Sequence, residues 1–468
     1  MLLRFVAQNF LSIADEVELN MFPAPRLRKH PNHVYQTPQV DLLKAAAIYG
    51  ANGAGKSNIV KAMAYLEQIV TEGDISNPFE NNNIKFKLST EFQNKPTHFE
   101  IEFKQKEKYY SYGIDFDEEV IYEEWLYELD IKTEKDELIF ERKLIDGKIK
   151  LNLHSNYLKT EKDRLRIELY QEEMLEIKKP FSFFLKEKNF DIAGNLRKWF
   201  GEIAIASPSS TFNIDSILSN NGALPNESNL YKSSYLTSLN NIIPALDTGV
   251  SNILFEKIKL SNFFDEDATK EIKGIISKTT TQDHSIIIMI EHEEEDEDKW
   301  IVGKDENNDC WVYIMKTEHQ TNEGNKSIFD LEEESDGTNR LFDLVPILDL
   351  LINDERVVII DEIGRSLHPS LLKKLITLIM KTPTKGQIIF TTHDSHLLDL
   401  DIFRPDEIWF VEKNKEGRTK AYTMSDFKPR YDENIEKGYL MGRFGAIPYL
   451  GDLDKLELEL NAETANTH

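Results

Sequence analysis

One eight-residue segment constrains the fold of this chain more than any other. Residues 50–57 read Gly-Ala-Asn-Gly-Ala-Gly-Lys-Ser, a full match to the phosphate-loop pattern G-x-x-x-x-G-K-[ST]. An apolar strand, Ala45 to Tyr49, precedes the loop, and apolar residues at helical spacing follow it. Backbone N–H groups in such a loop, together with the positive end of the following helix, bind phosphate. The segment therefore predicts a nucleoside triphosphate site in an α/β fold.

The loop also assigns roles to individual side chains, with ATP and Mg²⁺ as the expected ligands. We expect Lys56 to reach the β- and γ-phosphates and to act in catalysis, and Ser57 to bind Mg²⁺. The rest of the loop should hold the nucleotide: Asn52, Gly53, Ala54, Gly55 and Asn58.

A second acidic element is needed to hold the metal and to activate water. The apolar run Val357 to Ile360 predicts a buried strand, and Asp361 and Glu362 follow it directly. Asp361 is the expected Mg²⁺ ligand, and Glu362 the expected general base toward the attacking water.

Two further motifs lie near these elements in the sequence. His393 follows the strand Ile388 to Phe390, at the strand end where open α/β sheets bind ligands, and we expect it to sense the γ-phosphate. Upstream, the segment Glu334 to Thr338 precedes a helix, so that Ser335 or Thr338 is a candidate helix cap.

Two types of strand pattern predict the fold class. Short, wholly apolar strands alternate with helices around Leu341 to Ile352 and Leu371 to Met380, which is typical of a buried parallel sheet. Strict alternation between Phe99 and Leu129 predicts antiparallel strands with one solvated face. Pro346 lies inside the first of these helices and disfavours its continuity. We expect an α/β ATPase head with a mostly parallel core sheet, an antiparallel β lobe and a helical insertion.

This pattern divides the chain into four expected units. Residues 1–150 hold the phosphate loop and the antiparallel strands, and residues 151–325 form a mainly helical insertion with an acidic β-hairpin region. Residues 326–430 carry the second part of the ATPase, and residues 431–468 a C-terminal element. No long run of apolar heptads occurs, so we expect no coiled-coil arm.

Composition limits the cellular location of the protein and the classes of partner that it can bind. Lys and Arg total 56 against 82 Asp and Glu, giving a formal net charge of −26, which excludes a cationic nucleic-acid coat and leaves only a local nucleic-acid contact. The single cysteine, Cys310, excludes a disulfide framework. No apolar run is long enough to span a bilayer, and residues 1–9 do not resemble a signal peptide, so we expect a cytoplasmic protein without membrane contact.

Two charged segments allow alternative interpretations. Arg26, Arg28, Lys29 and His30 form a basic loop, which is either merely solvated or contacts phosphate or a partner. The acidic run 293–298 is either a mobile hairpin tip or a docking surface for a basic partner.

The order of phosphate loop, Ser-x-Gly turn, Asp-Glu strand and His strand resembles the ATP-binding-cassette ATPases, in the soluble branch that includes chromosome-maintenance and recombination ATPases. The resemblance implies that Ser335 and Gly337 close over ATP held by another subunit, so that at least a dimer forms. It also implies that residues 365–369 cross the dimer interface. A lobe glutamine should lie between residues 80 and 170, with Gln93 as one candidate.

Several longer segments resemble the RloA/AbiLi group of bacterial ATPases from abortive-infection loci, which are related to the overcoming-lysogenization-defect ATPases. The segments are residues 9–13, 48–52, 124–127, 334–338, 404–412 and 442–448. The resemblance implies antiphage defence alongside a separately encoded effector, such as a nuclease or toxin. Within the last segment, Arg443 either pairs with a surface carboxylate or contacts a partner.

Two other functions are alternatives to a defence switch. A DNA-repair or recombination ATPase that acts directly on DNA remains the alternative, although the charge of −26 disfavours it because DNA affinity depends on Lys and Arg. A fused nuclease domain is disfavoured because only 75 residues follow His393.

Overall fold

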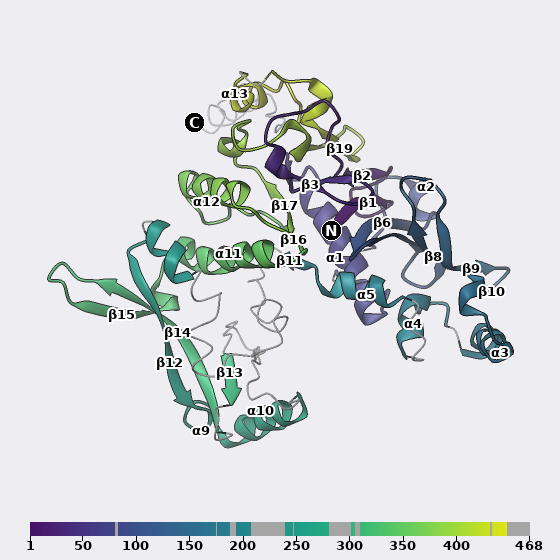
Figure 1. Cartoon of the computed structure of the whole chain (residues 1–468), viewed down its shortest axis with the longest axis horizontal. Helices are drawn as coiled ribbons and strands as arrows, with labels where there is room; N and C mark the ends of the chain where they lie inside the picture. The colour runs from purple at the N-terminus through teal and green to yellow at the C-terminus, as the bar shows by residue number, and fades with distance from the viewer. Residues whose placement is uncertain are drawn as a thin grey trace, which may run out of the picture.

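Two packed sheets form the body of the protein, and a third sheet projects from it (Figure 1). The computed structural model describes residues 1–79, 83–174, 176–187, 193–206, 239–246, 248–279, 301–304, 309–430 and 433–446. Within these ranges, no helix is long and apolar enough to cross a membrane.

The core sheet has six strands in the order β11-β16-β17-β5-β18-β19. All neighbours are parallel except β18 and β19. The predicted mostly parallel sheet is therefore confirmed. Its strands are β5 (Ala45–Tyr49), β11 (Ala204–Ala206), β16 (Val357–Ile360), β17 (Gln387–Thr392), β18 (Ile408–Lys413) and β19 (Thr419–Thr423).

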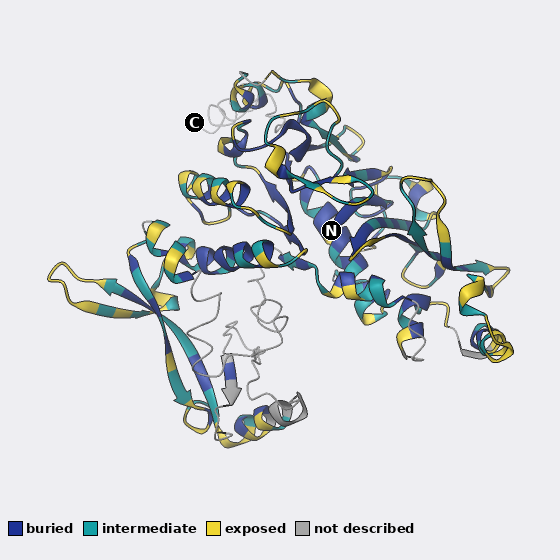
Figure 2. Cartoon of the chain, in the orientation of Figure 1, coloured by how far each residue is buried: buried dark blue, intermediate teal, exposed yellow. Residues whose placement is uncertain are grey.

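Strands β5 and β16 are apolar throughout because both faces of this sheet are covered. In β5, Ala46 and Ile48 pack into one hydrophobic cluster, and Ala45, Ala47 and Tyr49 pack into another. Figure 2 shows these central strands as almost entirely buried. Two-sided burial removes the polar alternation of a half-exposed strand.

Helices from distant parts of the chain cover the two faces. Buried side chains of α1 (Lys56–Glu72) join the first cluster, and those of α11 (Asp336–Asn353) and α12 (Pro369–Lys381) join the second. The predicted apolar helix is present as α11, one 18-residue helix that continues through Pro346 although this proline disfavours it. Pro346 is itself buried, and the apolar packing around it outweighs the missing hydrogen bond.

The predicted antiparallel lobe is a seven-stranded sheet in the order β10-β9-β8-β7-β6-β1-β2. Its inner face shares the first hydrophobic cluster with α1, which fixes the lobe against the phosphate-loop helix. The strands are β1 (Leu2–Gln8), β2 (Val17–Asn20), β6 (Thr97–Gln105), β7 (Lys108–Phe116), β8 (Ile121–Leu129), β9 (Glu137–Ile145) and β10 (Lys148–Leu153). A separate two-stranded sheet pairs β3 (Val34–Gln36) with β4 (Asp41–Leu43).

Residues 151–325 contribute both helices and strands. The helices are α3 (Glu161–Leu169), α4 (Phe181–Glu187), α5 (Gly194–Gly201), α9 (Leu260–Phe263) and α10 (Glu266–Thr279). Strand β14 (Cys310–Gln320) pairs with β12 (Val250–Lys259) along one edge, and with β13 (Ile301–Lys304) and β15 (Lys326–Asp330) along the other. This sheet extends away from the core beneath α11 (Figure 1). The acidic run 293–298 lies outside the described residues.

The C-terminal element packs against the core sheet through aromatic rings. Tyr439, in α13 (Ile435–Leu440), stacks on Phe410 with ring centroids 5.6 Å apart, and Phe444 lies 5.8 Å from the same ring. Arg443 forms an ion pair with Glu433 and is exposed, in agreement with the first of its two interpretations.

Candidate functional site

The phosphate loop lies between β5 and α1, and its glycines are required by close packing. A Cβ atom on Gly50 would lie 2.3 Å from the carbonyl oxygen of Val411. Gly55 has φ 110°, and a Cβ there would lie 2.2 Å from Thr419 Oγ1. Gly53 has φ 75° with open space beside it. The loop is therefore packed against β18 and β19 at two glycines and open at the third.

The side chain of Lys56 lies inside this loop. Its Nζ donates hydrogen bonds to the carbonyl oxygens of Gly50 at 2.7 Å and Ala51 at 3.1 Å. Burial lowers the pKa of Lys56, and the carboxylates of Glu362 and Asp361 oppose that shift. The lysine thus lies within the electrostatic field of both predicted acidic residues.

The hydroxyl groups of Ser12 and Thr419 and the side-chain amide of Asn58 form hydrogen bonds that hold the phosphate loop in place. Ser12 Oγ accepts a hydrogen bond from Asn58 Nδ2 at 2.6 Å and lies 2.7 Å from Thr419 Oγ1. Thr419 Oγ1 in turn donates to the carbonyl oxygen of Ala54 at 3.0 Å. Asn58, expected among the nucleotide-binding residues, therefore contacts Ser12 in this structure. Asn52 and Gly53 are exposed at the rim, whereas Ala54 is buried.

The acidic pair after β16 is organised by a threonine. Thr391 Oγ1 donates to Asp361 Oδ1 at 2.5 Å and accepts from the Glu362 backbone N–H at 2.7 Å. Asp361 is 4% exposed, whereas Glu362 is half-buried and has φ 50°, a left-handed conformation that is uncommon for glutamate. One hydroxyl thus fixes both the buried aspartate and the backbone that directs the glutamate.

Register brings the predicted residues to one edge of the sheet. β16, β17 and β5 are parallel neighbours, with Ile360 opposite Phe390 and Thr392 opposite Tyr49. Asp361, His393 and the phosphate loop therefore leave their strands side by side. His393 is exposed and forms no hydrogen bond among the described residues, so its ring is accessible to a ligand.

These groups fit a Mg²⁺–nucleotide complex. Among the described residues, no cluster of three or more His, Cys, Asp or Glu could hold a metal unaided. Mg²⁺ is commonly held by one or two protein oxygens together with substrate phosphates. Asp361 and Ser57 offer such oxygens, and the open glycine loop offers the phosphate cradle.

The Ser-x-Gly turn lies elsewhere, at the start of α11. Ser335 is exposed and caps the helix, accepting from the Thr338 backbone N–H at 3.1 Å. A Cβ on Gly337 would lie 3.0 Å from the carbonyl oxygen of Ser366, in the predicted interface-crossing loop. In Figure 1 the end of α11 that adjoins β14 and β15 lies far from α1. The cap interpretation of Ser335 is confirmed.

Glu334, which precedes the Ser-x-Gly turn, links this turn to the projecting sheet by hydrogen bonds. Glu334 accepts hydrogen bonds from Thr317 Oγ1 at 2.5 Å and from His319 Nε2 at 2.6 Å, both on β14. Its side chain is 6% exposed. No sequence pattern between residues 151 and 325 predicts these hydrogen bonds to Glu334.

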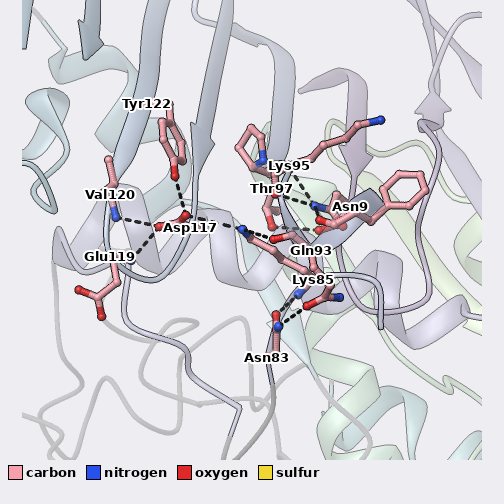
Figure 3. A network of polar contacts seen from close by, with 12 residues as sticks. Asn9, Asn83, Lys85, Gln93, Lys95, Thr97, Asp117, Glu119, Val120 and Tyr122 are labelled. Carbon is pink, nitrogen blue, oxygen red and sulfur yellow. Dashed lines mark hydrogen bonds and ion pairs between the residues drawn. The ribbon is translucent and has the colours of Figure 1, made fainter. Parts of the chain in front are cut away.

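Gln93, the candidate lobe glutamine, is engaged within its own lobe. It lies at the end of α2 (Thr90–Gln93), where its Nε2 donates to the Phe86 carbonyl oxygen at 2.6 Å and its Oε1 accepts from Asn83 at 2.8 Å. Figure 3 shows the Asn83–Gln93 contact within a polar network that also anchors Asn9, whose Nδ2 donates to three carbonyl oxygens. Gln93 thus stabilises the segment that surrounds Asn9.

Comparison with known proteins identifies the family. Residues 45–399 match the family described as "AAA domain, putative AbiEii toxin, Type IV TA system". The chain belongs to this AAA domain family. The matched region runs from β5 past His393, so that it includes every motif of the candidate site in this AAA domain protein. No curated protein matches its sequence.

Solved structures similar to this AAA domain protein include three head domains of SMC proteins. An Smc head bound to the C-winged helix domain of ScpA has TM-score 0.43 and 11% identity, covering 90% of this chain and 97% of that one. The SMC head from Thermotoga maritima has TM-score 0.39 and 11% identity, covering 90% and 98%. A head with an extended coiled coil bound to the C-terminal domain of ScpA, derived from Pyrococcus furiosus, has TM-score 0.36 and 13% identity, covering 91% and 97%.

Three residues without an assigned role in the sequence analysis join the site of the AAA domain protein. Thr391 lies in β17, two residues before His393, and this position at the strand end is the signal that could have marked its hydroxyl. Ser12 and Thr419 meet only through folding, because they are 407 positions apart. No local pattern marks either of them.

Proposed function

We propose that this AAA domain protein binds and hydrolyses ATP with Mg²⁺ and uses that cycle as a switch. The observation that carries the proposal is the shared threonine: Thr391 fixes both Asp361 and Glu362 beside the phosphate loop that holds Lys56. The loop would hold the phosphates, and Ser57 and Asp361 the metal.

The chemistry follows from the positions of these groups. Lys56, already directed into the loop, would neutralise charge on the β- and γ-phosphates. Glu362, half-buried and fixed through its backbone, would take a proton from the attacking water. His393, exposed at the next strand end, would contact the γ-phosphate and report its loss.

We infer that two copies complete each site. Ser335 and Gly337 begin an 18-residue helix, whose positive end favours an anion. Because this end of α11 lies away from the phosphate loop of its own chain, a second copy would bring it to the nucleotide. The exposed Ser366 and the neighbouring Gly337 would then share the interface.

The biological role that we propose is a cytoplasmic switch in bacterial antiphage defence, controlling a separately encoded effector such as a nuclease or toxin. The family description refers to a putative toxin of a type IV toxin–antitoxin system, and the sequence resembles the RloA/AbiLi group. Both support a role in an abortive response.

Hydrolysis by purified protein tests the enzymatic part. We expect Mg²⁺-dependent ATP hydrolysis, which Lys56→Ala and Glu362→Gln each lower by roughly 10²-fold or more. Hydrolysis that persists in both variants would contradict the site. The defence role is tested by plating phage on cells that carry the gene for this protein with or without the neighbouring reading frame. We expect protection only where the gene and the neighbouring reading frame are both present.

A further inference from the structure

A second hollow lies on the opposite edge of the core sheet from the candidate ATP site. It has a volume of about 970 Å³ and is open to solvent, and residues between Phe22 and Pro31, residues 34–41, Lys132 and Arg404 line it. Tyr35 on its wall donates to the carbonyl oxygen of Gly386, directly before β17 begins. The hollow therefore adjoins the amino ends of the core strands, whereas the phosphate loop follows their carboxyl ends. A ligand bound here would not compete with ATP.

A buried charged pair holds the wall of the hollow in place. Arg404 lines the hollow, is 2% exposed, and donates to both carboxylate oxygens of Asp406 at 2.9 and 2.7 Å. It also donates to the carbonyl oxygen of Lys29 at 2.9 Å, and Asp406 accepts from the Ala24 backbone N–H at 2.7 Å. The basic loop is thereby fixed at two points along its backbone.

Further contacts fix the other sides. His33 Nδ1 lies 2.9 Å from Glu407 Oε2, and both side chains are buried. Thr37 Oγ1 lies 2.7 Å from Tyr109 Oη, and Gln39 accepts from the Ile131 backbone N–H at 2.7 Å, next to Lys132. A pre-formed site loses less conformational entropy on binding than a mobile one.

The rim of the hollow is cationic. Arg28 and Lys132 line it and are exposed, and neither forms an ion pair among the described residues. Arg26 beside them is also exposed and unpaired in the described structure, whereas Lys29 pairs with Asp401 at 2.7 Å. Asp41 is the one acidic residue in the lining. This positive rim stands out in a chain with net charge −26.

One wall of the hollow is apolar, whereas the rest of its lining is polar. Four prolines and four larger apolar residues line it: Pro23, Pro25, Pro31, Pro38, Phe22, Leu27, Val34 and Val40. Prolines have fixed φ angles, so this wall changes shape little on binding. Its volume is near the upper end of the range of roughly 300–1,000 Å³ for ligand pockets.

We propose that this hollow binds a short acidic segment of a partner protein. Carboxylates of the segment pair with Arg28 and Lys132 at the rim, and apolar side chains between them pack on the proline-lined wall. Charge complementarity selects an acidic partner over a basic one. A nucleic acid fits less well, because its affinity depends on many phosphate contacts and the rest of this surface belongs to an acidic chain.

Peptide binding by the full chain tests the proposal. The probe is a fluorescein-labelled ten-residue peptide of alternating glutamate and leucine, measured by fluorescence anisotropy at about 0.1 M salt. The double variant Arg28→Glu/Lys132→Glu should bind at least about tenfold more weakly than the unmodified protein. The matched control Lys148→Glu/Lys150→Glu changes two exposed lysines on β10 and should bind as the unmodified protein does.

Two comparison probes and one activity measurement complete the test. The same peptide with lysine in place of glutamate should not bind, and a ten-nucleotide single-stranded DNA should bind more weakly than the acidic peptide. ATP hydrolysis by the double variant should stay unchanged, so the outcome does not depend on the ATP site. Absent peptide binding, an equal loss in the control, or tighter DNA binding that requires Arg28 and Lys132 would each overturn the proposal.

Discussion

Ser12 and Thr419 lie 407 positions apart in the sequence, yet their hydroxyl oxygens are 2.7 Å apart beneath the phosphate loop. Thr419 also donates to the carbonyl oxygen of Ala54 in the loop. Because Thr419 is 1% exposed, removing its hydroxyl takes one hydrogen bond from Ser12 and one from the Ala54 carbonyl oxygen at a position that little water reaches.

Thr419→Val should therefore weaken both the fold and the nucleotide site. We expect the free energy of unfolding to fall by about 1–3 kcal/mol, measured by urea denaturation. The affinity for ATP, measured by calorimetry, should also fall, because the Ala54 carbonyl oxygen in the phosphate loop loses its hydrogen bond from Thr419. Lys420→Ala, at the exposed neighbouring position on β19, should change neither quantity. Unchanged stability and affinity in Thr419→Val would show that the contact is dispensable.

Thr391 should matter for turnover more than for binding. Thr391→Val removes the hydroxyl that contacts Asp361 and the Glu362 backbone. We expect kcat for ATP hydrolysis to fall by up to about a hundredfold, because Glu362 loses its alignment toward water. Thr391→Ser keeps the hydroxyl and should retain most activity. Equal kcat values for the valine and serine variants would argue against a positioning role.

His98 should make stability depend on pH. Burial alone would lower its pKa, but the hydrogen bond and charge of Asp115, together with Glu100, outweigh this effect and raise the pKa above 6.5. The folded state thus binds the proton more tightly than the unfolded state, so the stabilisation is complete below pH 6.5 and is lost as pH rises through the folded pKa.

The comparison is between the unmodified protein and His98→Gln in urea denaturation near pH 6 and near pH 9. The stability difference should be larger near pH 6. A difference that is constant with pH, or larger near pH 9, would contradict the assignment.

Glu334 should link the projecting sheet to the helix that carries Ser335. Glu334→Ala removes the one carboxylate oxygen that accepts from both Thr317 and His319, so the turn should lose its fixed position. We expect weaker ATP-dependent self-association, measured by light scattering, with ATP binding unchanged. Glu332→Ala, at an exposed neighbouring position, is the control. Unchanged ATP-dependent self-association of the Glu334 variant would show that the projecting sheet does not control dimer formation.

The sequence predicted those parts of the site that local chemistry defines. The phosphate loop, the Asp361–Glu362 pair and His393 are each marked by a strand and a loop in succession, and the parallel sheet follows from wholly apolar strands. The contacts of Thr391, Ser12 and Thr419 depend on strand register and on segments hundreds of positions apart, which no local pattern records.

Two structural features were missed for related reasons. Strand β11 has only three residues, too few to show a period, yet it joins the core sheet beside β16. Propensity alone disfavours a helix that continues through Pro346, whereas tertiary packing keeps α11 continuous.

The central claim is that each ATP site is shared between two copies, and a mixing experiment tests it most directly. Lys56→Ala removes the phosphate-loop lysine, and Ser335→Arg blocks the start of α11, so each variant alone should be inactive. In a mixture, half of the dimers pair an intact phosphate loop with an intact Ser335 turn at one of two sites. The equimolar mixture should therefore recover about a quarter of the unmodified ATPase rate. No recovery in a mixture shown to form mixed dimers, or full activity of Ser335→Arg alone, would contradict the account.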